Sequence, residues 1–285
     1  MICKLLHHTR QGYLKHLKAQ PAKQLHDEIA VFKVITYRQT QPQVGGRKLK
    51  KMMYEEKEDS FSIGRDHLFD LLREEGLLVK VKHSFKSCTD YKHNLMIHPN
   101  LLIDLLITKV NQVFVSDITY LRTYKGFVYL YLITDYFSRK IVGSYVSYDL
   151  KTESAIVALK QFKGKVSSTN GAIHHSDHGV QYCSVKYQAA LKKCEMRTSM
   201  TGKRHCYDNA VAERVNGILK QEFGMKRIFS DIKIAREAAS DAVKIYNEER
   251  LHISLGYNTP ASVYELGILA EATQQQSALQ VGASA

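Results

Sequence analysis

The sequence predicts an α/β fold in which a mixed sheet of five strands is flanked by helices and preceded by a small helical region. Three successive runs rich in Val, Ile, Tyr and Phe begin at residue 113, and their connections are short enough for antiparallel hairpins. After residue 151, helical and strand-like segments alternate, as in parallel strands joined by crossover helices. Before residue 80, apolar residues recur at helical spacing, which predicts the separate helical region.

Residues 1–80 are predicted to form short helices joined by tight turns. Leu25, Ile29 and Phe32 lie at the spacing of one helix face and predict an amphipathic helix packed through that face. In "SIGRDHLFDLLREEGLL", Ser62 is placed to cap a helix and Gly76 to end it. Basic residues at the helix starts favour a DNA-binding helix-turn-helix, although a small helical bundle without DNA contacts fits the same pattern.

Residues 81–112 are predicted to form a basic linker, since "VKVKHSFKSCTDYKHNLMIHPN" is irregular and ends in Pro and Asn. The apolar "LLIDLLI" that follows is expected to dock on a neighbouring domain.

Residues 113–227 contain the predicted sheet. Its first three strands are "VFVSDITYL", "FVYLYLITDYF" and "KIVGSYVSY", and the fourth and fifth are "GAIHHSD" and "RTSM". Helices are predicted in "KTESAIVALKQFKGK", "SVKYQAALKKCEM" and "DNAVAERVNGILKQEFG". A further helix and an additional segment occupy residues 228–270, and residues 271–285 are polar and small enough to be expected as a disordered tail.

Composition narrows the class of partner. The 285 residues have a net charge of +13 spread along the chain, which favours a polyanion, and nucleic acid is the commonest one. Five cysteines without a Cys-x-x-Cys pair favour a reduced cytoplasmic protein. The sequence contains no run of 18 apolar residues, so we expect no membrane-spanning helix. A basic surface on a protein that binds no nucleic acid remains an alternative at this point.

Three carboxylates stand out by their positions. Asp117 lies within an apolar strand, where a carboxylate is unfavourable unless it is paired or binds a metal. Asp177 follows the fourth strand, and Glu213 comes after 35 intervening residues, enough to return to the same sheet end. Glu213, Asn216 and Lys220 share one helix face, so Lys220 can meet a phosphate if Glu213 meets a metal. Three carboxylates from separate elements suit Mg²⁺, and paired Mg²⁺ ions catalyse phosphoryl transfer.

These motifs resemble a known family. "SDITY", "HSDHGVQY" and "YDNAVAERVNGILKQE", at this spacing, resemble the DDE catalytic core of retroviral-integrase-type transposases, and in particular the OrfB protein of two-frame bacterial insertion sequences. "GRKL" and "IGRDHLFDLLREEGLLVK" are similar to the N-terminal helix-turn-helix portion of that family, and "YNEERLHISLGYNTPASVY" is similar to its C-terminal signature. The resemblance covers nearly all of the chain except the tail.

The resemblance implies a ribonuclease-H-like fold and DNA strand cleavage and strand transfer at the ends of a mobile element. It implies Asp117, Asp177 and Glu213 as ligands of two Mg²⁺ ions, for which Mn²⁺ can substitute. Double-stranded DNA, further copies of the chain and an upstream OrfA-type product, fused or associated, are the expected partners, which places the protein in the cytoplasm on the nucleoid. The expected DNA contacts are Lys220, Asn216, Lys203, Arg204, Arg65, Arg47 and Lys48. Where the family usually has Trp, this chain has Phe114, which can fill the same apolar site.

Two other functions remain open from the residues alone. A metal-dependent nuclease of the same fold would cleave without joining, and a catalytically inert regulator would bind DNA through its N-terminal helices. A zinc site at His174, His175 and His178 is disfavoured because no Cys-x-x-Cys pair completes it.

Three other carboxylates have structural interpretations. Asp135 is expected to serve a turn or a salt bridge to Arg139, Asp208 to cap a helix, and Glu222 to be solvated.

Overall fold

A computed structural model of the chain describes residues 9–56, 61–79, 95–164, 166, 169–202 and 209–282. The chain divides into two compact units, residues 1–83 and 84–285, and each is described by itself. Among the helices of the described ranges, none is long and apolar enough to cross a membrane.

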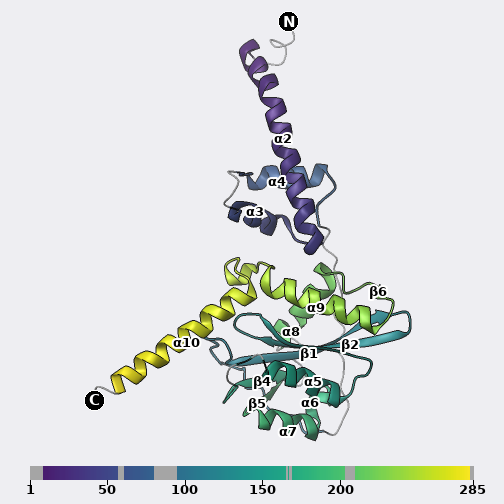
Figure 1. Ribbon diagram of the computed structural model, residues 1–285, viewed down its shortest axis with the longest axis vertical. Helices are drawn as coiled ribbons and strands as arrows, with labels where there is room; N and C mark the ends of the chain where they lie inside the picture. The colour runs from purple at the N-terminus through teal and green to yellow at the C-terminus, as the bar shows by residue number, and fades with distance from the viewer. Residues whose placement is uncertain are drawn as a thin grey trace. The chain divides into compact units, whose positions relative to one another are not determined.

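The first unit consists of helices α2 (Arg10–Thr40), α3 (Gly46–Glu55) and α4 (Arg65–Glu74), shown in Figure 1. Its core is made by apolar residues of all three helices, including Ala30, Val34, Leu49, Met53, Leu68, Leu71 and Leu72. The predicted packing face of α2 is wrong, because Leu25, Ile29 and Phe32 are 60%, 38% and 70% exposed. Spacing identified an apolar stripe, but α3 and α4 pack on the opposite stripe, where the small Ala30 permits close approach.

The ends of α4 test two expectations about capping. Gly64 occupies the N-cap and makes no side-chain bond there, so the expected cap by Ser62 is wrong. Gly76 has a φ of 66° directly after the helix, which confirms its role in ending it, since this left-handed conformation favours glycine.

The second unit is built on one sheet. Antiparallel pairing joins β1 (Val113–Thr123), β2 (Gly126–Asp135) and β3 (Ile141–Ser147) as a meander. β4 (Ile173–Ser176) pairs parallel to β1, and β5 (Arg197–Met200) pairs parallel to β4. The order β3-β2-β1-β4-β5 confirms the expected mixed sheet of ribonuclease-H-like type. The sequence did not predict the two-residue β6 (Ile228–Phe229), which pairs with β1.

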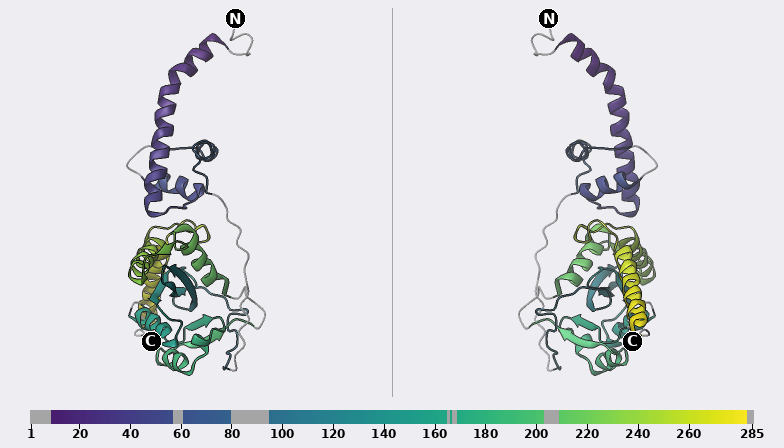
Figure 2. Two further views of the ribbon diagram at one scale, coloured as in Figure 1. Left: turned by 90° about the vertical axis from the view of Figure 1, so that its right-hand side faces the viewer. Right: turned by 90° about the vertical axis from the view of Figure 1, so that its left-hand side faces the viewer.

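Helices cover both faces of this sheet (Figures 1 and 2). On one face lie α5 (Thr152–Lys163), α6 (Val180–Cys183) and α7 (Val185–Lys193), and on the other lie α8 (Ala210–Glu222) and α9 (Ile232–Glu248). Successive side chains of a strand point to opposite faces, so β1 supplies Phe114 to the first layer and Leu121 to the second.

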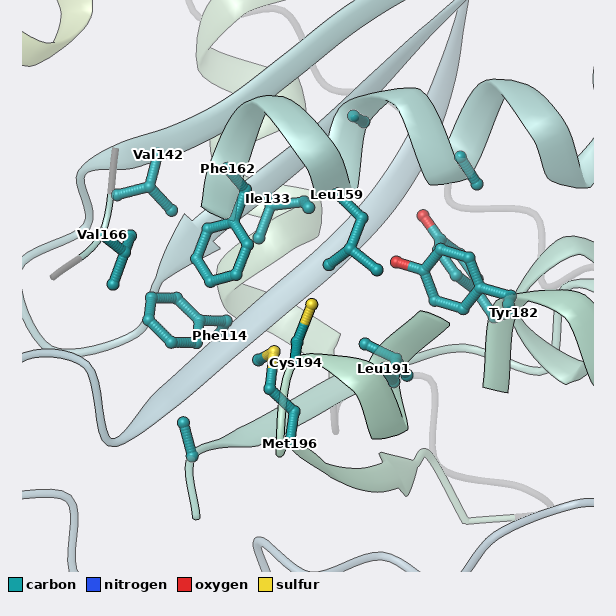
Figure 3. Close-up of a cluster of buried hydrophobic side chains, with 14 of the residues drawn as sticks. Phe114, Ile133, Val142, Leu159, Phe162, Val166, Tyr182, Leu191, Cys194 and Met196 are labelled. Atoms are coloured by element: carbon teal, nitrogen blue, oxygen red, sulfur yellow. The ribbon is translucent and has the colours of Figure 1, made fainter. Parts of the chain in front are cut away.

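Phe114 is fully buried in the first of these layers. Figure 3 shows it beside Phe162 of α5, and the two rings meet edge to face with centroids 4.6 Å apart. This confirms that Phe at this position fills an apolar site in the core.

The apolar segment before the sheet packs on the core, as expected, whereas the expected disordered tail is largely helical. Leu101, Leu102, Leu105 and Ile107, from the end of the predicted linker, pack against the β1–β4 region, and the Leu101 amide donates to Ser199 Oγ at 2.9 Å. The 3-10 helix η2 (Ile253–Leu255) precedes α10 (Pro260–Gly282). The expected disorder from residue 271 is therefore wrong for residues 271–282, because a run rich in Ala, Gln and Leu extends a helix that has already begun.

Candidate active site

Asp117 lies in the middle of β1, the central strand of the sheet. One carboxylate oxygen, Oδ1, accepts the amide of Ile118 at 2.8 Å, and the other, Oδ2, accepts Nδ2 of Asn216 at 2.7 Å. The backbone and α8 therefore fix the orientation of this carboxylate.

Asp177 follows directly after β4, on the strand next to β1. Val115 pairs with His175 in parallel register, so Asp117 and Asp177 both lie two residues further along adjacent strands, which run about 4.8 Å apart. The Gly179 amide donates to Asp177 Oδ1 at 3.0 Å and forms a tight turn around the carboxylate. A Cβ atom at Gly179 would lie 3.1 Å from this oxygen and 3.0 Å from Gln181 Oε1, so a larger residue would crowd Asp177.

Helix α8 carries Glu213 and Asn216 and is bonded through Asn216 to Asp117 of β1. One stripe of the helix packs on the core, with Ala212, Val215 and Leu219 buried. The opposite stripe holds Glu213 in the first turn and Asn216, whose bond to Asp117 ties the helix to the sheet. Asn209, just before the helix, donates from Nδ2 to the carbonyl of Ser116 at 3.2 Å and adds a second tie.

The three carboxylates influence one another electrostatically. The pKa of Asp117 is raised to about 7, mainly by burial and then by the negative charges of Asp177 and, more weakly, Glu213. The hydrogen bonds from Ile118 and Asn216 oppose this shift but do not cancel it. The site thus concentrates more negative charge than its own donors neutralise.

This donor set fits a hard divalent cation, because every ligand is a carboxylate oxygen and the site has excess negative charge. Within the part of the chain that the structure describes, however, no three His, Cys, Asp or Glu side chains lie close enough to hold a metal ion as they stand. Asp177 raises the pKa of Asp117 more than Glu213 does.

Lys220 lies two turns beyond Glu213 on α8, as its spacing predicted. Its Nζ lies 4.1 Å from the centroid of the Tyr120 ring, a cation–π contact that was not predicted. Burial lowers the pKa of Lys220, and the nearby Asp117 carboxylate opposes that shift. The lysine is therefore held beside the carboxylates.

The remaining expected DNA contacts have mixed outcomes. Lys203 and Arg204 lie outside the described residues. Arg47 on α3 and Arg65 on α4 are exposed in the first unit, and Arg65 also pairs with Asp66 at 2.8 Å. Lys48 is only 9% exposed because it lies on the packed side of α3, which makes it less accessible to DNA than Arg47 or Arg65.

Two carboxylates that were not expected to bind a metal, Asp135 and Glu222, make structural contacts. Asp135 Oδ1 accepts the amide and hydroxyl of Ser138 at 2.7 and 2.6 Å, which confirms that it stabilises a turn. Glu222 was expected to be solvated, and this is wrong. It forms a two-pronged ion pair with Arg250 at 2.8 and 2.7 Å, with the arginine side chain only 4% exposed. Asp208 lies outside the described residues.

The histidines near Asp177 form structural hydrogen bonds. His174 contacts Ser116 Oγ at 2.7 Å and Tyr187 Oη at 3.0 Å, and burial lowers the pKa of His174 to about 3. His175 contacts Ser199 Oγ at 2.8 Å, and His178 contacts the carbonyl of Thr201 at 2.6 Å. Each ring thus joins neighbouring segments of the fold.

The chain is similar to integrase core domains and to proteins of bacterial insertion sequences. Two family models, both described as an integrase core domain, match residues 107–206 and 194–260. An uncharacterized 31 kDa protein of insertion element IS600 from Shigella sonnei is 32% identical over 272 residues, covering 93% of this chain and 97% of that protein. Transposase InsF of insertion sequence IS3A from Escherichia coli is 35% identical over 191 residues, covering 66% of each chain.

Two viral structures are also similar at low identity. The HTLV-2 integrase catalytic core domain in complex with magnesium has a TM-score of 0.44 at 16% identity, covering 54% of this chain and 96% of that one. The simian T-cell lymphotropic virus intasome in complex with a PP2A regulatory subunit has a TM-score of 0.48 at 16% identity, covering 82% of this chain and 73% of that one.

Proposed function

This chain belongs to the insertion-sequence transposases that contain an integrase core domain, and from that premise we propose that Asp117, Asp177 and Glu213 form its catalytic centre. Membership makes it a DNA transposase, whose reaction is polynucleotidyl transfer. The observation that supports the proposed centre is the adjacency of Asp117 and Asp177 on parallel strands, with α8 held against Asp117 by Asn216.

Each of the three carboxylates has a distinct part in the proposal. Asp117, fixed by Ile118 and Asn216, would hold divalent ions together with Asp177 from the turn after β4 and Glu213 from α8. Bound Mg²⁺, or Mn²⁺ in its place, would activate the attacking hydroxyl and stabilise the departing oxygen of the phosphodiester. Lys220 would bind a phosphate oxygen next to Asp117 and orient the strand.

The proposed reaction has two steps at each end of the mobile element. In the first, water adds to a phosphodiester at the end of the element, the bond to the 3′-oxygen breaks, and a 3′-hydroxyl is released. In the second, that 3′-hydroxyl attacks a phosphodiester of the target, so one phosphorus–oxygen bond forms as another breaks. Both steps can use the same three carboxylates, since water and a sugar hydroxyl are equivalent nucleophiles at such a site.

DNA binding and assembly into oligomers follow from the family in general terms. We further propose that the chain acts as a homo-oligomer on the ends of its element, in the cytoplasm on the nucleoid. Association or fusion with an OrfA-type product is part of the proposal and is supported by the sequence resemblance.

One experiment tests the proposed function. Full-length protein is incubated with labelled DNA from the ends of the element that encodes it, in Mg²⁺, in Mn²⁺ and in a chelator. Metal-dependent nicks together with joined products support a transposase. Nicks without joined products would instead indicate a nuclease, and binding without either product would indicate a regulator.

A further inference from the structure

A cavity of about 210 Å³ opens beside Asp117 and Asp177. Its walls are mainly apolar and come from five parts of the second unit: β1, β2, the segment before α5, the turn after β4, and α6. The apolar and aromatic side chains that line it are Ile118, Tyr120, Tyr129, Leu150, Val180 and Tyr182. The two catalytic carboxylates thus form one side of a largely apolar cavity.

Large apolar groups are exposed around this cavity. Tyr120, Leu150 and Val180 are 57%, 44% and 45% exposed, whereas Tyr182 is 3% exposed and lies at the edge of the core in Figure 3. Nε2 of Gln181 donates to the Leu150 carbonyl at 2.7 Å and so ties two walls together. The cavity is therefore held open by contacts already made in the chain, and its rim presents apolar surface to solvent.

The arrangement of Tyr120 links the cavity to the expected position of the DNA strand. Tyr120 and Tyr129 are directly paired across β1 and β2, so their side chains stand on the same face of the sheet. Lys220, which would bind a phosphate, lies against the Tyr120 ring at 4.1 Å from its centroid. One aromatic side chain therefore lines the cavity and contacts the phosphate-binding lysine.

The lining also excludes a second phosphate as occupant. None of the described residues that line the cavity is Lys or Arg, and both charged members are aspartates. A flat, uncharged, aromatic group suits such a space, because exposed aromatic side chains in nucleic-acid-binding proteins stack on bases of any sequence.

We propose that this cavity binds one unpaired nucleobase of the DNA strand whose phosphate lies at the carboxylates, with the base stacked on Tyr120. The proposal rests on the proposed function for the identity of that strand. It assigns Tyr120 a role in positioning the substrate, because a stacked base fixes its own backbone phosphate relative to Asp117 and Asp177. A base must leave its pair to enter the cavity, which is easiest at frayed or distorted ends.

The test compares two fluorescent single-stranded oligonucleotides of equal length and charge, one of thymidine nucleotides and one made entirely of abasic nucleotides. The readout is the ratio of their affinities for the full-length protein in Mg²⁺. Tyr120→Ala should reduce this ratio by about fivefold or more, because one stacked base contributes ~1–3 kcal/mol. Tyr120→Phe keeps the ring and should leave the ratio unchanged.

Two controls separate stacking from other effects. Tyr124→Ala removes a 79% exposed tyrosine that does not line the cavity, and should leave the ratio unchanged. Lys220→Ala should weaken binding of both oligonucleotides alike, since it removes a phosphate contact and leaves the base contact. Thermal unfolding of each variant checks that the exposed substitutions leave the fold intact.

A Tyr120→Ala protein with the parental ratio, or one that changes no more than Tyr124→Ala, would overturn the proposal. These outcomes are distinguishable from failure of the proposed function. If end DNA is cleaved and joined but the ratio does not depend on Tyr120, only the base-binding cavity is wrong. If the ratio depends on Tyr120 but no cleavage occurs, the cavity binds bases and the proposed catalytic centre is wrong.

Discussion

At the scale of single residues, Asp117 has the most unusual environment in the site. Its two oxygens each accept one hydrogen bond, from Ile118 and Asn216, yet burial and the neighbouring carboxylates still raise its pKa to about 7. Without a cation, ionising this group in the folded protein is therefore unfavourable. The same excess of negative charge makes the site attractive to divalent cations.

Asp117→Asn should stabilise the metal-free protein at neutral and higher pH. The folded pKa of about 7 lies above the ordinary value of 3.8, so the folded state holds an extra proton between these values. This group's contribution to stability is therefore fully present below about pH 4 and is lost as pH rises to about 7. In a chelator at pH 8, Asp117→Asn should unfold several degrees higher than the parent, at about 2–4 °C for each kcal/mol regained.

At pH 4.5 the difference in unfolding temperature should become small, because Asp117 is then protonated in the folded state. Asp241→Asn, an exposed carboxylate on α9, serves as the control and should show no gain at either pH. Equal unfolding temperatures for the parent and Asp117→Asn at pH 8 would mean that Asp117 is not under electrostatic strain.

Lys220→Ala should weaken binding of end DNA and lower cleavage without changing the Mg²⁺ concentration that gives half-maximal activity. Lys220 lies beside Asp117 but is not a metal ligand. Lys192→Ala removes an exposed lysine from α7, on the opposite face of the sheet from α8, and is the matched control.

A salt titration of DNA binding distinguishes the two lysine variants. The loss caused by Lys220→Ala should shrink at low salt, where the remaining basic residues suffice, and the slope of log affinity against log salt should fall by about 1. Equal, small effects from both variants would show that Lys220 does not contact the DNA.

At the scale of elements, α8 determines the site because it presents Glu213, Asn216 and Lys220 from one rigid body. Its first turns are held by Asn209 and Asn216 against β1, and its last turn is held by the ion pair of Glu222 with Arg250. Arg250 comes just after α9, so this pair ties the end of α9 to the end of α8. Arg250 belongs to the C-terminal signature segment, residues 246–264, so this segment helps to hold α8, which carries Glu213, in position.

Arg250→Ala should destabilise the protein by roughly 3 kcal/mol, because it leaves the Glu222 carboxylate in a mostly buried position without its cation. Urea unfolding measures the change. Lys186→Ala breaks the exposed pair with Glu153, whose side chains are 73% and 58% exposed, and should change stability by less than ~1 kcal/mol. A loss for Arg250→Ala no greater than for Lys186→Ala would remove the ion pair as an anchor of α8.

Sequence patterns predicted the elements of the second unit better than the contacts between their side chains. Runs rich in Val, Ile, Tyr and Phe located the first three strands, and the alternation of helical and strand-like segments located the other two principal strands. The partner of Glu222 was missed because a contact over 28 positions leaves no local spacing signal. Tyr120 was missed for a similar reason, since an exposed strand aromatic near a helix lysine looks like an ordinary strand residue.

At the scale of the whole molecule, the chain combines two units with different folds. The helical unit has exposed Arg47 and Arg65 near the starts of α3 and α4, and the second unit contains the carboxylates. The buried face of α2 could not be predicted from its sequence, because α2 has two apolar stripes and only tertiary packing selects one. The length of α10 was missed because composition alone favoured a tail.

Residues 1–80 should supply much of the affinity for DNA. The affinity of the full-length protein for end DNA should fall steeply with salt, as counterion release requires, and a chain lacking these residues should bind more weakly with a shallower slope. Fluorescence anisotropy at several salt concentrations measures both slopes. Equal affinities and slopes for the two chains would show that the second unit binds DNA unaided.

The most direct test of the account is cleavage and joining of end DNA by three amide variants, Asp117→Asn, Asp177→Asn and Glu213→Gln. Amides keep the shape of each side chain but remove the charge that a divalent ion requires. The account predicts that each variant loses Mg²⁺-dependent cleavage and joining by a factor of at least about 10³ while it still folds and binds DNA, and that Asp241→Asn remains active. Parental activity in any one of the three variants would contradict the assignment of that residue to the catalytic centre.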